Sequence, residues 1–155
     1  MRSRLAWTVG LIAALAATAG AARSDAPLQN RLEAAVVSKF PQFVEWPDTA
    51  LAGRSSVDLC VAAPNPFGDD LEQLVTGDSV AGRRLVVRDV DRDQDLAGCQ
   101  LLYVAAPAQA RRSLLQAAAA RPVLTVSDDP RFLDQGGIVR LRVVDGRLRF
   151  DIDAS

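Results

Sequence analysis

The stretch Cys99-Gln100-Leu101-Leu102-Tyr103-Val104-Ala105 is an almost unbroken apolar run. A run of this length is typical of a strand that is covered on both faces, as happens when helices pack on the two sides of a parallel sheet. The stretch therefore predicts a buried strand, around which the rest of the chain can be placed.

Outward from this strand, β-prone and helix-prone segments alternate along the chain. Further strands are expected at Val57–Ala62, Arg83–Val90, Val123–Val126, Ile138–Val144 and Arg147–Ile152, and helices at Leu28–Val44, Asp69–Val75 and Gln109–Ala120. Asp145-Gly146 separates the last two strands, and aspartate-glycine between β-prone runs is a strong hairpin signal. Strands interleaved with helices predict a mostly parallel sheet. The expected fold is α/β, a single Rossmann-like three-layer domain with a C-terminal antiparallel hairpin.

The first expected helix carries apolar residues at a spacing that fits one helical face, namely Leu32, Ala35, Val36, Phe40, Phe43 and Val44. Pro41 lies inside this pattern. Proline removes an amide donor and clashes with the preceding turn, so a kink or a break into two segments is expected just before it. Trp46-Pro47 then ends the helix.

The N-terminus has the features of a cleavable secretory signal. Arg2 and Arg4 precede an apolar run from Leu5 to Ala19, and the small residues Ala19-Gly20-Ala21-Ala22 follow. We expect residues 1–21 to be a signal peptide and residues 22–155 to be one domain, exported from the cytoplasm. Without Arg2 and Arg4 the 18 basic residues become 16 against 19 acidic ones, a net charge of −3, which argues against nucleic acid as a partner.

Cys60 and Cys99 are the two cysteines of the chain. An even pair in an exported protein favours one disulfide over a metal site or a catalytic thiol, and two unlinked buried thiols are the alternative.

Residues for catalysis or metal binding are scarce. The chain has no histidine, and Lys39 is its one lysine. The acidic run Asp91–Asp95 resembles the start of a calcium loop, but Leu96 and Leu102 stand where glycine and glutamate are needed. Ser127 and the aspartates near it lack a histidine or lysine close in sequence. We therefore predict no catalytic residue, metal or cofactor.

Two aromatic residues, Trp46 and Phe67, lie beside prolines at the ends of expected elements. Core packing is one explanation for residues of this kind. An exposed edge that binds a partner is the other.

Five stretches in order resemble the YfiR-like periplasmic proteins, and together they cover nearly the whole mature chain. They are Phe40–Pro47, Leu59–Val61 with Pro66-Phe67-Gly68, Gly98–Val104, Val123–Asp128 continuing through Phe132 to Ile138, and Arg147–Ile152. The resemblance matches Cys60 and Cys99 to the family's cysteine pattern. The second cysteine pair of some members is absent, and the sequence stops at Ser155, where the family usually continues into a helix.

The resemblance implies a non-enzymatic regulator that represses a membrane-bound diguanylate cyclase by binding its periplasmic sensor domain. It further implies sequestration by an outer-membrane lipoprotein, possible homodimers, and an influence on cyclic di-GMP and biofilm formation. A periplasmic small-molecule sensor, with a cleft at the carboxyl ends of the strands, is the alternative.

Overall fold

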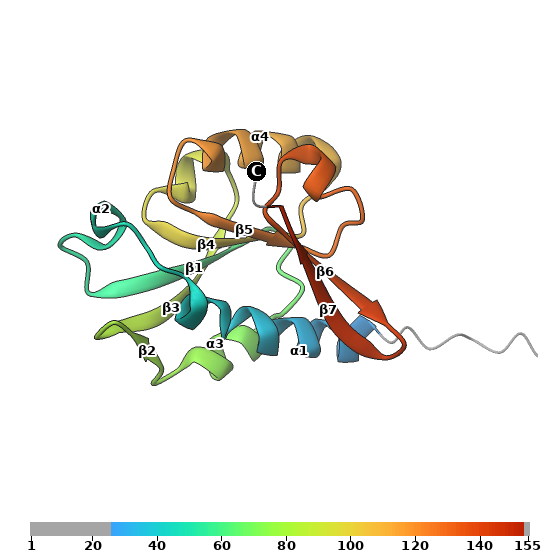
Figure 1. The fold of residues 1–155 in the computed structure, drawn as a ribbon, viewed down its shortest axis with the longest axis horizontal. Coiled ribbons are helices and arrows are strands. Elements are labelled where there is room, and N and C mark those ends of the chain that lie inside the picture. Colours follow the sequence, from blue (N-terminus) through green and yellow to red (C-terminus); the bar gives the residue numbers. More distant parts are fainter. Residues whose placement is uncertain (1–25, 154–155) are drawn as a thin grey trace, which may run out of the picture.

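The computed structural model of the protein describes residues 26–153 (Figure 1). The predicted signal peptide, residues 1–21, lies outside this range. The strands are β1 (Ser56–Ala62), β2 (Ser79–Val80), β3 (Arg83–Val90), β4 (Cys99–Val104), β5 (Leu124–Ser127), β6 (Val139–Val144) and β7 (Arg147–Ile152). The α-helices are α1 (Ala26–Val37), α2 (Asp48–Leu51), α3 (Asp70–Val75) and α4 (Ala108–Ala119), and the 3-10 helices are η1 (Phe40–Phe43), η2 (Asp93–Leu96) and η3 (Leu133–Gln135).

The strands form one sheet in the order β2-β3-β1-β4-β5-β6-β7. The five inner strands are parallel, and β2 and β7 are antiparallel to their neighbours at the two edges. The expected α/β fold, with a mostly parallel sheet and a C-terminal antiparallel hairpin, is confirmed. The short strand β2 was not predicted.

Helices cover both faces of the sheet and make three layers (Figure 1). The helices α1 and α3 pack on one face, where they enclose a core that includes Leu59, Leu101 and Tyr103. The other face is covered by α4 and η2, whose core includes Cys60, Leu102 and Phe132. All six residues of β4 are buried, as a strand between two helical layers requires. Within residues 26–153, no helix is long and apolar enough to cross a membrane.

The predicted break at Pro41 is confirmed. Helix α1 ends at Val37, and η1 begins at Phe40 with Pro41 in its first turn, where the missing amide costs no helical hydrogen bond. The face of α1 that points into the core differs from the expected stripe, because its buried residues are Glu33, Ala34 and Val37.

The hairpin turn is of the type that its sequence predicts. Asp145 and Gly146 have φ values of 52° and 69°, the left-handed conformations that a two-residue type I′ turn requires. The register runs from Val144 opposite Arg147 to Val139 opposite Ile152, so side chains alternate between the two faces along the whole hairpin.

Candidate functional site

The predicted disulfide between Cys60 and Cys99 is present. It joins the neighbouring central strands β1 and β4, with 5.8 Å between the two Cα atoms. Cys60 is fully buried, and Cys99 is 4% exposed. The register of these strands shifts between Asp58 and Leu59, so that Gln100 is an extra residue on β4. The bridge therefore fastens the sheet beside a local irregularity.

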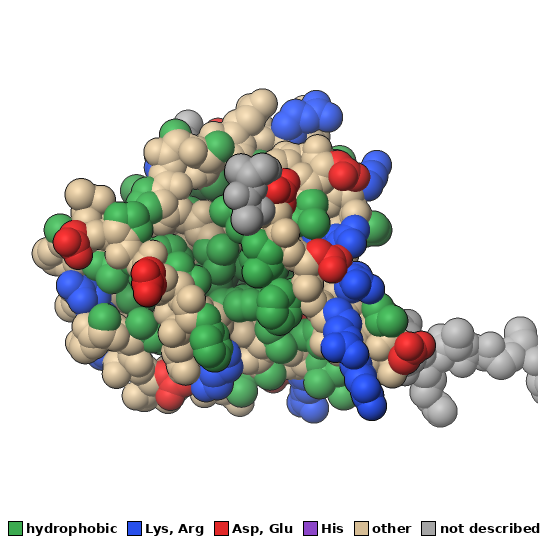
Figure 2. All heavy atoms as spheres, in the orientation of Figure 1, with side chains coloured by type: hydrophobic (Ala, Val, Ile, Leu, Met, Phe, Trp, Pro, Cys, Tyr) green, Lys and Arg blue, Asp and Glu red, His purple; other side chains and the backbone are tan. Residues whose placement is uncertain are grey.

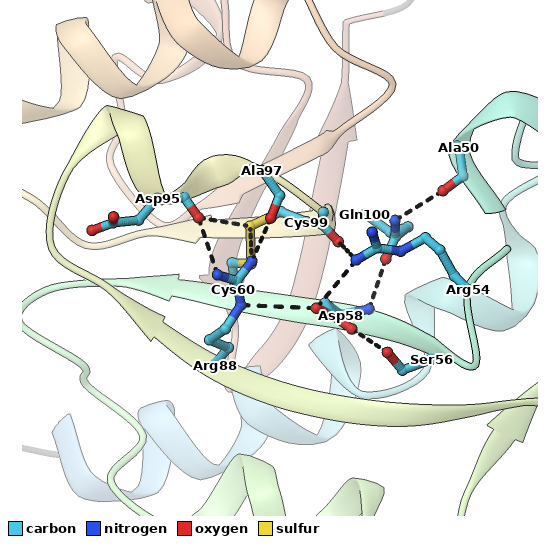
Figure 3. A network of polar contacts seen from close by, with 11 residues as sticks. Ala50, Arg54, Ser56, Asp58, Cys60, Arg88, Asp95, Ala97, Cys99 and Gln100 are labelled. Carbon is cyan, nitrogen blue, oxygen red and sulfur yellow. Dashed lines mark hydrogen bonds and ion pairs between the residues drawn. A yellow bond between two sulfur atoms is a disulfide. The ribbon is translucent and has the colours of Figure 1, made fainter. Parts of the chain in front are cut away.

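The guanidinium group of Arg88, on β3, lies against the disulfide (Figure 3). Its Nη2 atom is 3.4 Å from Sγ of Cys99 and 3.6 Å from Sγ of Cys60. Arg88 also donates to the carbonyl oxygens of Asp95 and Ala97, at 3.2 and 2.9 Å. These bonds connect the loop that contains η2 to the sheet.

A second set of polar contacts surrounds Asp58 and Gln100 (Figure 3). The carboxylate of Asp58 accepts a hydrogen bond from Ser56 at 2.6 Å and lies 3.4 Å from Nη2 of Arg54. The buried Gln100 accepts from the Asp58 amide at 2.7 Å and donates to the carbonyl of Ala50 at 3.2 Å. Gln100 thus provides an acceptor for the Asp58 amide beside the register shift, and its second hydrogen bond reaches a carbonyl of α2. This network links α2 to the sheet and has a structural role.

The two aromatic residues considered as partner-binding candidates lie in different environments. Phe67 is 4% exposed, and its ring packs on Tyr103 with 4.5 Å between centroids. Trp46 is half-buried at the border of the same core, and its Nε1 atom is buried without a hydrogen-bond partner among the described residues. The ring contacts among the described residues do not join the two side chains to each other. A binding role for either one stays a prediction.

A buried carboxyl group was missed by sequence reasoning. Glu33 of α1 is 1% exposed, and it accepts a hydrogen bond from the Tyr103 hydroxyl at 2.6 Å and another from Gln29 at 2.8 Å. Burial raises the pKa of Glu33, although its hydrogen bonds with Tyr103 and Gln29 oppose that shift, and nearby Asp128 adds to it. Tyr103, inside the apolar strand β4, was the available signal in the sequence. A buried hydroxyl usually needs a hydrogen-bond partner, so this residue indicated that a polar side chain would lie beside it.

Ser127, the nearby Asp129 and Asp151 all make structural contacts. The Ser127 hydroxyl donates to the carbonyl of Val104 at 2.6 Å. Asp129 pairs with the buried Arg111 at 2.7 Å, and Asp151 pairs with Arg140 and Arg142.

Within residues 26–153, the surface holds an apolar groove of about 530 Å³, which we call the apolar groove. Its walls come from α1 and η1 on one side and from β5, β6 and β7 on the other. Figure 2 shows apolar side chains gathered at the middle of this face, between η1 and the β6–β7 hairpin. Phe43 is 81% exposed and Phe150 is 52% exposed. The lining residues are Ala35, Val36, Lys39, Phe40, Phe43, Val44, Leu124, Val139, Phe150 and Ile152.

Most of the apolar stripe that the sequence showed in residues 32–44 lines this groove. Ala35, Val36, Phe40, Phe43 and Val44 are all members of the wall. The helical periodicity was therefore a valid signal of an apolar face, but that face is covered only in part by the described chain. Large exposed apolar surfaces on a folded protein commonly mark binding sites.

A second, smaller pocket of about 220 Å³ lies at the carboxyl ends of β1 and β4. This is the place where ligands bind in many open α/β sheets. It is lined by Ala62, Ala63, Asp91, Arg92, Asp93, Ala106, Ala110, Ser113 and Leu114.

These features define a disulfide-linked, Rossmann-like α/β protein with an exposed apolar groove. Comparison with known families agrees and is more specific: the YfiR/HmsC-like family model, DUF4154, matches residues 30–155, and the chain belongs to that family. Its members are periplasmic regulators of cyclic di-GMP signalling, and the family is regulatory rather than catalytic. No curated protein matches the chain.

Proposed function

We propose that this protein is exported to the periplasm by residues 1–21 and represses a membrane-bound diguanylate cyclase by binding its periplasmic sensor domain. The observation that carries the proposal is the family match over residues 30–155. Repression would lower cyclic di-GMP and, with it, exopolysaccharide production and biofilm formation. An outer-membrane lipoprotein that sequesters the protein would relieve the repression.

The mechanism needs no chemistry in the periplasm. A partner that binds only the inactive conformation of a cyclase shifts the conformational equilibrium by its differential affinity for the two states. The disulfide supports such a role, because it keeps the central strands in one arrangement outside the reducing cytoplasm.

The apolar groove is the surface that this function would use. Phe43, at the end of η1, is exposed at the groove, and the half-buried Trp46 follows three residues later in an extended segment. Large aromatic side chains in such positions commonly carry much of the energy of a protein interface. The expected occupant is an apolar segment of the cyclase's sensor domain.

The test is affinity capture from membranes together with measurement of cellular cyclic di-GMP. Loss of the protein should raise cyclic di-GMP, and the wild type should capture a membrane protein with a cyclase domain. The Phe43→Ser variant should neither capture the membrane protein nor lower cyclic di-GMP. Its melting temperature should not change, because this side chain is 81% exposed. Leu74→Ser, on α3 and 41% exposed, is the matched control and should behave as the wild type. Unchanged cyclic di-GMP after deletion would refute the proposal.

The pocket at the carboxyl ends of β1 and β4 favours one second candidate, a small-molecule sensor. Its polar lining residues include Asp91, Arg92 and Ser113. A metabolite that raises the melting temperature of the wild type and not of Ser113→Trp, with no protein partner captured, would support this candidate instead.

A further inference from the structure

The last strand, β7, presents backbone groups with which another strand can pair. It is the outermost strand at its end of the sheet, next to β6. The two-residue turn and the bond from the Asp153 amide to the Ile138 carbonyl show that the odd-numbered residues of β7 direct their backbone groups toward β6. Leu148, Phe150 and Ile152 therefore direct theirs outward, and within residues 26–153 no hydrogen bond reaches these outward groups. An edge of this kind is a template for a further strand.

One face of this edge is apolar and continues the apolar groove. Phe150 and Ile152 line the groove and are 52% and 57% exposed, and Phe40 holds the Phe150 ring in an edge-to-face contact at 5.7 Å. Neighbouring strands lie about 4.8 Å apart, and the side chains of facing residues lie on the same side of the sheet. Apolar residues at every second position of an added strand would therefore cover the exposed sides of Phe150 and Ile152.

The other face of β7 is basic. Arg147 and Arg149 are exposed, and no described residue forms an ion pair with either of them. Asp151 lies on the same face, but its carboxylate already accepts hydrogen bonds from Arg140 and Arg142. Figure 2 shows basic side chains in a row along this hairpin. Charge complementarity therefore favours acidic residues in an added strand at the positions that face Arg147 and Arg149.

The direction of pairing follows from the geometry of the ladder. In an antiparallel pair, Phe150 exchanges both backbone hydrogen bonds with the residue directly opposite, whose side chain lies on the groove face. The same apolar residues of the added strand then make the backbone bonds and the apolar contacts. Antiparallel pairing is also slightly more stable per residue than parallel pairing. The strand at the opposite edge of the sheet, β2, has two residues and offers few backbone groups.

We propose that β7 binds an extended segment of the partner protein as an added antiparallel strand, in which apolar residues alternate with acidic ones. This inference rests on the proposed function, because the segment belongs to the partner that occupies the apolar groove. The apolar residues of the segment cover Phe150 and Ile152, and its acidic residues face Arg147 and Arg149. Main-chain hydrogen bonds supply affinity in this mode of recognition, and the alternating side chains supply specificity.

The backbone part of the proposal is tested with a fluorescent peptide of about eight residues, alternating valine and glutamate, in anisotropy titrations of the purified chain. The wild type should bind this peptide. Methylation of every valine amide should weaken binding at least about tenfold, because these amides face β7. Methylation of the glutamate amides is the matched control and should leave binding unchanged, since these amides face away. Failure of the unmodified peptide to bind, or equal binding of the two methylated peptides, would overturn the proposal.

The charge part is tested by reversing the basic face. Arg147→Glu/Arg149→Glu should bind the valine–glutamate peptide at least about tenfold more weakly and should bind a valine–lysine peptide instead, which also shows that the variant is folded. The control Arg84→Glu/Arg112→Glu makes the same change of net charge at exposed positions of β3 and α4, and it should keep the preference of the wild type. An unchanged preference in Arg147→Glu/Arg149→Glu would contradict the assigned pattern.

The binding mode and the proposed function fail in different experiments. If deletion of the protein raises cyclic di-GMP but the wild type does not bind the peptide, the added strand is refuted and the regulatory role stands. If the peptide binds with the expected dependence on methylation and charge but deletion leaves cyclic di-GMP unchanged, strand addition at β7 is supported and the proposed function is refuted.

Discussion

Removal of the disulfide should lower the stability of this protein by a predictable amount. The bridge spans a sequence separation of 39 residues. In the chain-entropy model, a closed loop of this size stabilises the folded state by about 4 kcal/mol, because it restricts the unfolded chain. For a domain of this size that energy corresponds to a shift in melting temperature of roughly 10–20 °C.

The double variant Cys60→Ala/Cys99→Ala separates the cross-link from the packing of the sulfurs. Without reductant, the wild type should melt well above the variant. After the wild type has been unfolded and refolded in reductant, its melting temperature should fall close to that of the variant. The difference in melting temperature that remains between the reduced wild type and the variant reports the loss of two sulfur atoms from the core. This loss should be measurable because Cys60 is fully buried and Cys99 is nearly so.

Circular dichroism melts with and without reductant provide the measurement, and the variant supplies the control because reductant should not change its melting temperature. Arg88 keeps its bonds to the carbonyls of Asp95 and Ala97 in the variant, so the loop around η2 should remain attached. Equal melting of wild type and variant in the absence of reductant would refute the reasoning.

Two further predictions concern buried groups. Because burial raises the folded-state pKa of Glu33, the stability that this group contributes is complete at acid pH and is lost as pH rises through that raised pKa. Glu33→Gln should therefore gain stability relative to the wild type as pH rises above 4.5, the usual pKa of a glutamate, in urea denaturation, and parallel stability curves would contradict this. Gly137→Ala should cost about 1–3 kcal/mol, because the added methyl group would overlap the buried Phe132 ring. Phe132→Leu should recover part of that loss in a double-mutant cycle; additive losses would exclude the overlap.

The fold was predictable because its strongest signals are local. The apolar run at residues 99–105 and the Asp145-Gly146 turn each indicate one structure, and each lies where expected. The β2 strand escaped prediction because two residues, Ser79 and Val80, carry no periodicity, and they pair only because β3 lies beside them. The order of the strands likewise depends on contacts between segments far apart in the sequence.

The candidate site was less predictable, since its parts meet only in the folded chain. Leu124, Val139 and Phe150 belong to different strands, and each fits an ordinary core strand when taken alone. Glu33 is another example, because a glutamate in an amphipathic helix is normally solvated. It is buried here because Tyr103, about 70 residues later, supplies the hydrogen bond that compensates for burial.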